Sequence, residues 1–111
     1  MQYPEQDKPI YLWDLRKDGT IIKSKIVNYK INSFYSDSYY FFKAESSNAT
    51  RSLRGRQMNR FVNGRVGSFD GDDAKAMKII EDTLVSRKQK YKEDYERVSK
   101  LLEQLRVNDA T

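Results

Sequence analysis

The chain of 111 residues contains no cysteine and no histidine. Without thiol or imidazole groups, it has no means of forming a disulfide, a cysteine or histidine metal site, or a Ser-His or Cys-His catalytic pair. The sequence also lacks a Walker loop, a glycine-rich dinucleotide motif and a correctly spaced calcium loop. We therefore expect a binding protein rather than an enzyme, with no metal ion and no cofactor.

Long apolar runs are missing as well, and none approaches the roughly 20 residues that a membrane-spanning helix needs. Residues 1–9 are polar, hold both prolines and do not contain the apolar core of a signal peptide. Because cysteine is absent too, a reducing compartment suits the chain. We expect a cytoplasmic protein with no membrane contact, folded as a single domain over residues 1–111.

The first part of the chain predicts an antiparallel sheet. After a flexible arm at residues 1–9, short runs of β-branched and aromatic residues alternate with turn signals over residues 10–69, which indicates four to five strands. Hairpin turns are expected at the Asp-Gly pair of residues 18–19 and the Asn-Gly pair of residues 63–64, since both stand between apolar runs. The four consecutive rings of residues 39–42 predict a strand that is covered on both faces.

Less regular stretches complete this predicted sheet. The polar clusters at residues 32–33 and 36–38 predict turns, with residues 34–35 in a short strand between them. Residues 44–50 predict a polar loop, and residues 57–62 predict a strand that leads into the second hairpin.

The second part of the chain predicts one long helix at residues 70–107, followed by a tail at residues 108–111 that frays. No glycine or proline follows Gly71. Candidate N-caps precede the helix at Ser68, Asp70 and Asp72. Apolar or aromatic residues recur along the helix at heptad-like steps with one four-residue stutter. These residues are Met77, Ile80, Leu84, Tyr91, Tyr95, Val98, Leu102 and Leu105. The fold class is thus α+β, with a small N-terminal sheet and one long C-terminal helix.

The length of this helix predicts self-association. A helix of about 35 residues is roughly 52 Å long, whereas a small sheet with strands of five or six residues spans about 20 Å. The apolar stripe beyond the sheet would face water in a monomer, and a second copy of the helix is the simplest cover. We expect a homodimer or higher oligomer formed through the helix. The alternative is a helix that bends near residues 86–90 and folds back on itself.

The net charge of the chain lies in one segment. Residues 51–69 contain five arginines and no acidic residue, which equals the net charge of +5 of the whole chain. The remainder is close to balanced, with a net charge of +1 before this segment and −1 after it. A local patch of one sign attracts an anionic partner.

Arginine is suited to shaped recognition of phosphate, because its planar guanidinium donates two parallel hydrogen bonds and stacks on rings. An aromatic ring and an asparagine between arginines suit a nucleotide base. The candidate ligand-binding residues are Arg51, Arg54, Arg56, Arg60, Phe61, Asn63 and Arg65, with Arg97 and Arg106 from the helix.

Stacking of Phe61 on a ligand depends on the direction in which its side chain points. On a regular strand Arg54, Arg56 and Arg60 share one face, and Phe61 then points into the core, where it would not stack on a ligand. In the alternative, the arginines form salt bridges with the acidic first turns of a neighbouring helix, and the segment is a solvated hairpin.

The layout, in which residues 66–70 lead from the sheet into a charged helix, resembles small proteins encoded by phages of low-GC Gram-positive bacteria. Among these, it is similar to the Thoeris anti-defence proteins that sequester cyclic ADP-ribose-type signals. In that family an arginine, an aromatic residue and an asparagine hold the base, and Arg60, Phe61 and Asn63 have those residue types. The resemblance covers the architecture of most of the chain rather than a motif.

This resemblance implies a viral protein in the host cytoplasm that acts as a sponge for an anionic nucleotide signal and so counters a bacterial defence system. Two other functions stay open. One is inhibition of a defence nuclease by protein contact, as anti-CRISPR proteins do. The other is binding of DNA or RNA.

Overall fold

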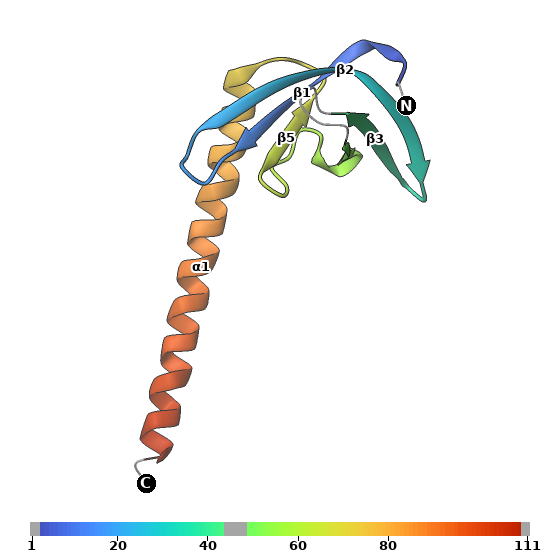
Figure 1. Cartoon of the computed structure of the whole chain (residues 1–111). Helices are drawn as coiled ribbons and strands as arrows, with labels where there is room; N and C mark the ends of the chain where they lie inside the picture. The colour runs from blue at the N-terminus through green and yellow to red at the C-terminus, as the bar shows by residue number, and fades with distance from the viewer. Residues whose placement is uncertain (1–2, 44–48, 110–111) are drawn as a thin grey trace. The chain divides into compact units, whose positions relative to one another are not determined.

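The computed structural model describes residues 3–43 and 49–109. Over these residues it contains a five-stranded antiparallel sheet followed by one long helix (Figure 1). The predicted α+β fold is therefore confirmed. The strands are β1 (Glu5–Leu15), β2 (Ile21–Phe34), β3 (Asp37–Lys43), β4 (Thr50–Arg54) and β5 (Arg65–Ser68).

The strand order across the sheet is β4-β3-β2-β1-β5. Strand β2 is long enough to pair with a different strand along each half of its length. Its first half pairs with β1, where Ile26 lies opposite Ile10, and its second half pairs with β3, where Tyr29 lies opposite Phe42. The sheet therefore turns along β2, and Figure 1 shows this strand bending over the others.

Strand β1 begins earlier than predicted. Residues 5–9 were expected in a flexible arm, but Glu5 already pairs with Asn28, and the register shifts between Glu5 and Ile10. The shift accommodates Tyr29, whose hydroxyl donates to the Lys8 carbonyl at 2.6 Å while Gln6 Nε2 donates to the Tyr29 carbonyl at 2.7 Å. Burial raises the pKa of the Tyr29 phenol. The prediction of an arm is thus wrong for residues 5–9, because the Gln6 side chain and the Lys8 carbonyl form hydrogen bonds with Tyr29 of β2.

Both predicted dipeptide turns are confirmed. Gly19 has a φ of +89° and closes the β1–β2 hairpin, and Asp18 Oδ1 accepts hydrogen bonds from the backbone N–H and the hydroxyl of Thr20 at 2.9 and 2.6 Å. These bonds lower the pKa of Asp18. Asn63 and Gly64 have φ values of +54° and +77°, as the tight two-residue hairpin turn requires.

The predicted turn at residues 32–33 is wrong. Asn32 and Ser33 lie within β2, opposite Tyr39 and Ser38 of β3, and the chain reverses between Phe34 and Asp37. Tyr35 takes the positive φ of +56° that this turn needs. Residues 34–35 therefore form no strand of their own. The cross-strand pairing overrides the turn preference of the short polar side chains.

The arginine-rich segment differs most from its prediction. Strand β4 occupies residues 50–54, so it begins at the last residue of the predicted loop, and residues 44–48 of that loop lie outside the described residues. The predicted strand at residues 57–62 is replaced by a 3-10 turn, η1 (Gly55–Gln57), and a bend at Asn59, whose φ is +58°. The Asn59 N–H donates to the Gly67 carbonyl at 2.7 Å, which holds the bend against β5.

The core consists of two clusters on opposite faces of the sheet. Along β1, Leu12 faces one cluster and Trp13 faces the other, as the alternation of a strand dictates. The first cluster contains Ile10, Leu12, Ile26, Tyr29, Phe42 and Leu53. The second contains Trp13, Phe61, Val66, Ala76 and Ile80, of which the last two come from the start of the helix.

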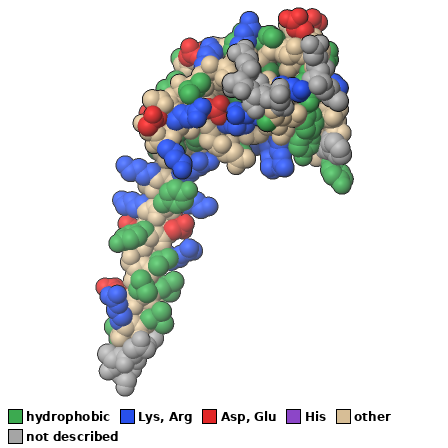
Figure 2. Space-filling view, in the orientation of Figure 1, with side chains coloured by type: hydrophobic (Ala, Val, Ile, Leu, Met, Phe, Trp, Pro, Cys, Tyr) green, Lys and Arg blue, Asp and Glu red, His purple; other side chains and the backbone are tan. Residues whose placement is uncertain are grey.

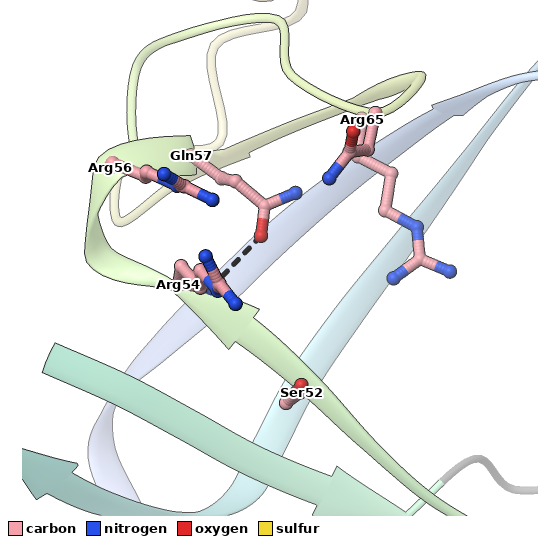
Figure 3. Close-up of a pocket in the computed structure, with 6 residues that line it drawn as sticks. Ser52, Arg54, Arg56, Gln57 and Arg65 are labelled. Carbon is pink, nitrogen blue, oxygen red and sulfur yellow. Dashed lines mark hydrogen bonds between the residues drawn. The ribbon is translucent and has the colours of Figure 1, made fainter. Parts of the chain in front are cut away.

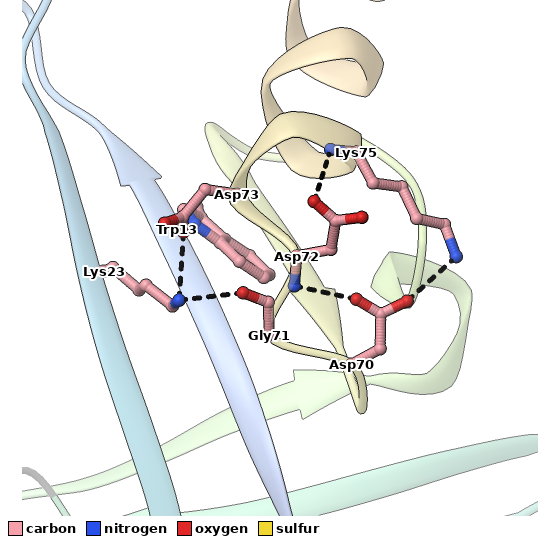
Figure 4. A network of polar contacts seen from close by, with 7 residues as sticks. All are labelled: Trp13, Lys23, Asp70, Gly71, Asp72, Asp73 and Lys75. Carbon is pink, nitrogen blue, oxygen red and sulfur yellow. Dashed lines mark hydrogen bonds and ion pairs between the residues drawn. The ribbon is translucent and has the colours of Figure 1, made fainter.

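Helix α1 (Asp73–Asp109) has 37 residues and is continuous. The alternative in which it folds back near residues 86–90 is therefore wrong. It begins three residues later than predicted, because the three candidate N-caps act in succession, and Figure 4 shows the bonds made by Asp70 and Asp72. Ser68 Oγ accepts from the Asp70 N–H at 3.2 Å, Asp70 Oδ1 from the Asp72 N–H at 2.8 Å, and Asp72 Oδ1 from the Lys75 N–H at 3.3 Å. Only the last of these bonds caps the helix itself.

By its internal contacts the chain divides into two compact units, Met1–Ile80 and Glu81–Thr111, where one domain was predicted. The first holds the sheet and the start of α1, and the second is the remainder of α1. Across residues 3–43 and 49–109, no helix combines the length and the apolar character that a membrane crossing requires.

The start of α1 is joined to the sheet through Asp73. Its Oδ1 accepts a hydrogen bond from Trp13 Nε1 at 3.0 Å and forms an ion pair with Lys23 Nζ at 3.0 Å (Figure 4). Lys23 also donates to the Gly71 carbonyl at 2.9 Å. The Lys23 ammonium, and then the Trp13 indole, lower the pKa of the Asp73 carboxyl.

We predict that this contact makes stability depend on pH in the acidic range. Because the folded state lowers the pKa of Asp73, the contact contributes fully above the ordinary aspartate pKa of 3.8 and is lost as the pH falls through the lower folded value. Urea unfolding followed by circular dichroism between pH 7 and 2 should therefore show a flatter acid limb for Asp73→Asn than for the unaltered protein. Asp82→Asn, on the exposed side of α1, is the charge-matched control and should retain the steep limb. Parallel profiles for the two variants would contradict the assignment.

Candidate anion-binding pocket

A pocket of about 340 Å³ lies between β4, η1 and β5 in the first unit. Strand β4 ends at Arg54, η1 reverses the chain, and the Asn-Gly turn brings β5 back alongside. Figure 3 shows the side chains that line the pocket, with Arg54, Arg56 and Gln57 on one side of the view and Arg65 on the other. They are Ser52, Arg54, Arg56, Gln57, Asn63 and Arg65.

Gln57 fixes the shape of the pocket from inside. Its side chain is only 6% exposed, and its amide joins the two ends of the turn. Oε1 accepts a hydrogen bond from the Arg54 N–H at 2.9 Å (Figure 3), and Nε2 donates to the Val62 carbonyl at 3.2 Å. Both ends of this buried amide are thereby satisfied, as burial requires.

Arg65 is held by an acidic residue of the neighbouring strand. Its Nε lies 2.9 Å from Asp14 Oδ1, and the two residues are cross-strand partners on β5 and β1. Both side chains are largely shielded from solvent, at 28% and 23% exposed. The ion pair orients one nitrogen of the guanidinium and so fixes the direction of the whole group.

Arg54 is held by a ring rather than by an acid. Its guanidinium carbon lies 5.5 Å from the centre of the Tyr39 ring, which is within the range of a cation–π contact. Tyr39 in turn stacks on Phe41, with ring centres 6.2 Å apart and planes 18° apart. The pocket is therefore continuous with a pair of aromatic side chains on β3.

The charge of the pocket is positive. Three guanidinium groups line it, one of them paired with Asp14. Asp37 lies next to Gly55 of η1, since a Cβ built on Gly55 would be 2.9 Å from Asp37 Oδ1, and it is not among the lining residues. Guanidinium groups remain protonated in proteins, so the lining offers permanent charge and N–H donors. The chemistry of such a lining is suited to an anion.

Four of the nine predicted site residues line this pocket: Arg54, Arg56, Asn63 and Arg65. Arg51 and Arg60 are exposed and lie outside its lining. The shared face that a regular strand would give Arg54, Arg56 and Arg60 is not found, because η1 interrupts the strand after Arg54.

The stacking role predicted for Phe61 is also wrong. Its side chain is 5% exposed and packs with Trp13 and Val66 in the second core cluster. Burial of an apolar ring contributes favourably to the free energy of folding, so this ring packs in the core and not against a ligand. The rings next to the pocket are instead Tyr39 and Phe41, which the sequence presents as part of a strand covered on both faces.

Two lining residues, Ser52 and Gln57, are not among the predicted site residues. The alternation of β4 gives a signal for the first, since Ser52 and Arg54 lie on the face opposite the buried Leu53. No local pattern reveals the second, because the burial of Gln57 depends on the folded turn.

The two helix arginines lie in the second unit. Arg97 is 3.4 Å from Asp94 of the preceding turn. Arg106 lines a separate groove on α1 with Lys100, Glu103, Gln104 and Val107.

In the predicted alternative, the arginines pair with the acidic residues at the start of a helix. Within the described chain, two of these acidic residues pair with lysines instead. Asp70 pairs with Lys75 at 3.2 Å and Asp73 pairs with Lys23 at 3.0 Å. Hydrogen bonding to the Asp72 N–H and to Lys75 lowers the pKa of Asp70. Lysines therefore occupy these two carboxylates. Among residues 3–43 and 49–109, no group of three or more acidic side chains is arranged to hold a metal ion.

No family model, curated protein or solved structure matches this chain.

We predict that Gln57→Leu destabilises the protein by about 1–3 kcal/mol, because the Arg54 N–H and the Val62 carbonyl both lose a buried partner. Trp13 is the single tryptophan, so urea unfolding is followed by its fluorescence. Ser52→Ala, at an exposed pocket position, is the control and should change the free energy of unfolding by less than about 0.5 kcal/mol. Equal stability of Gln57→Leu and the unaltered protein would show that the amide does not hold the turn.

Proposed function

We propose that this chain is a non-enzymatic binding protein that captures an anionic, nucleotide-type ligand in the arginine pocket. The observation that carries this proposal is the convergence of Arg54, Arg56 and Arg65 from β4, η1 and β5 on one pocket. Like charges repel at short range, so arginines that served only solubility would be more stable apart than in one pocket.

Two further features support a nucleotide-type ligand. The volume of about 340 Å³ lies at the lower end of the range for small-molecule sites, which suits a phosphorylated group of nucleotide size. Arginine forks bind phosphate oxygens in pairs, and the side chains of Asn63, Gln57 and Ser52 supply neutral polar groups beside them. In the setting that the layout resemblance implies, the ligand is a signal of a bacterial defence system and the protein lowers its free concentration.

Two alternatives make different predictions. A DNA- or RNA-binding protein would show an affinity that falls steeply with salt, because several counterions are released on binding. An inhibitor of a defence protein would bind neither nucleotides nor nucleic acid and would use the same arginines against an acidic protein surface.

The pocket makes a testable prediction about two arginines in the same segment. Arg56→Gln removes a guanidinium from the pocket and should weaken binding of pyrophosphate and ADP at least tenfold, which corresponds to about 1.4 kcal/mol and is typical of a lost charged hydrogen bond. Isothermal titration calorimetry at fixed salt measures this change. Arg60→Gln removes the same charge outside the pocket lining and should bind nearly as well as the unaltered protein.

Three results would count against the proposal. Equal losses for the two variants would indicate a diffuse charge effect. A short DNA that binds more tightly than ADP, with a steep salt dependence, would favour the nucleic-acid alternative. An absence of binding to both probes would leave the protein-inhibitor alternative.

We also propose that the protein is a homodimer or higher oligomer through the second unit. The aromatic and aliphatic residues of the stripe remain exposed, with Val98 and Leu102 each 48% and Leu105 59% exposed. Figure 2 shows hydrophobic side chains at successive levels along the lower part of α1. From Tyr91 to Leu105 they follow steps of four and three residues, which is the spacing that a second helix of the same kind covers by knobs-into-holes packing.

We predict that Leu102→Glu converts the oligomer to a monomer, because it places a carboxylate in the middle of the stripe. Size-exclusion chromatography with light scattering should give at least twice the chain mass of 13.1 kDa for the unaltered protein and a single chain mass for the variant. Gln104→Glu adds the same charge on the other side of α1 and should leave the mass unchanged. A single chain mass for the unaltered protein at micromolar concentration would refute self-association.

A further inference from the structure

Two rows of side chains cross the outer face of strands β2, β3 and β4 beside the pocket. In the first row, Tyr39 of β3 lies between Asn32 of β2 and Arg54 of β4. In the second, Phe41 of β3 lies between Lys30 of β2 and Ser52 of β4. Arg54 and Ser52 also line the pocket, so the rows and the pocket form one continuous surface.

The two rings on this face are not part of the core. Along β3 the alternate residues point to the other side, where Phe42 is buried in the first core cluster and Tyr40 packs against it. Tyr39 and Phe41 therefore stand on the opposite face, half-buried, with nearly parallel rings. An aromatic pair that the core does not use is suited to contact a ligand.

The contact between Tyr39 and Arg54 links the rings to the charged groups. At 5.5 Å the guanidinium carbon lies over the ring, and a guanidinium supported in this way loses less conformational freedom when it binds a ligand. Arg54 is thus shared by the aromatic pair and the pocket. A ligand that uses both parts must carry an aromatic ring next to its negative charge.

We propose that Tyr39 and Phe41 form a base-binding surface, on which the nucleobase of the ligand stacks while its phosphates lie among Arg54, Arg56 and Arg65. This inference rests on the proposed function and names the part of the ligand that the arginines do not recognise. The exposed amide of Asn32, across from Tyr39, is placed to contact the edge of the base. The ligand class is a nucleotide rather than a sugar phosphate or an inorganic polyphosphate.

The test compares two probes that share a diphosphate, ADP and pyrophosphate, by titration calorimetry. The unaltered protein should bind ADP more tightly. Phe41→Leu keeps an apolar side chain on the strand but removes the ring, and it should reduce ADP affinity by about 5- to 150-fold, the range for loss of one base–aromatic stack. It should leave pyrophosphate affinity unchanged, because Phe41 does not line the pocket.

The outcomes separate this inference from the function on which it rests. If the unaltered protein binds pyrophosphate as tightly as ADP, or if Phe41→Leu weakens both probes equally, the base-binding surface is wrong and anion capture stands. If neither probe binds, the proposed function fails as well. Circular dichroism and the unfolding midpoint of Phe41→Leu determine whether this variant is folded. Were it unfolded, Asn32→Ala on the exposed end of the row would replace it and should lower ADP affinity alone; an unchanged ADP affinity would then overturn the surface.

Discussion

The structure depends on the close approach of β5 to the end of β4 and to the residues that follow η1. Gly67 permits it, because a Cβ at this position would stand 2.9 Å from Leu53 Cδ2 and 3.0 Å from Met58 Sδ. Leu53 is fully buried at this point, and the Asn59 N–H reaches the Gly67 carbonyl at 2.7 Å. The two edges of the sheet are thereby brought together instead of both facing solvent, which limits the exposure of unpaired backbone groups.

This approach is also what assembles the pocket. Arg54 and Arg56 lie between Leu53 and Met58 in the chain, and Arg65 lies two residues before Gly67, so the three arginines line one pocket only because these segments approach each other. Bringing three guanidinium groups together is unfavourable in itself. The Asp14 ion pair and the Tyr39 ring offset part of this repulsion, and an anion between the arginines would offset more. The arrangement is therefore consistent with the proposed capture of an anion.

The functions proposed for the two compact units depend on different physical interactions. In the first, a buried amide, an ion pair and a ring position charged groups for recognition. In the second, a regular spacing of exposed apolar residues suits association by burial of apolar surface. The proposed ligand capture and the proposed self-association involve separate residues, so each proposal is testable without altering the other.

The sequence alone determined the features that depend on local preferences. These features act through neighbouring residues, and each appears in the structure. They are the Asp-Gly and Asn-Gly turns, the aspartates before the helix, and the run without glycine or proline after Gly71. The α+β order follows from them. The concentration of arginine in residues 51–69 likewise marked the segment that builds the pocket.

Tertiary structure decided what depends on distant partners. Asn32 and Ser33 are strand residues only because β3 lies opposite, and Phe61 is a core residue because Trp13 and Val66 cover it. Gln57 is buried between Arg54 and Val62, and Tyr39 rather than Phe61 meets an arginine. Local sequence does not encode these outcomes, since a hydrogen bond or a ring contact between remote residues forms only once the sheet has curled around Gly67.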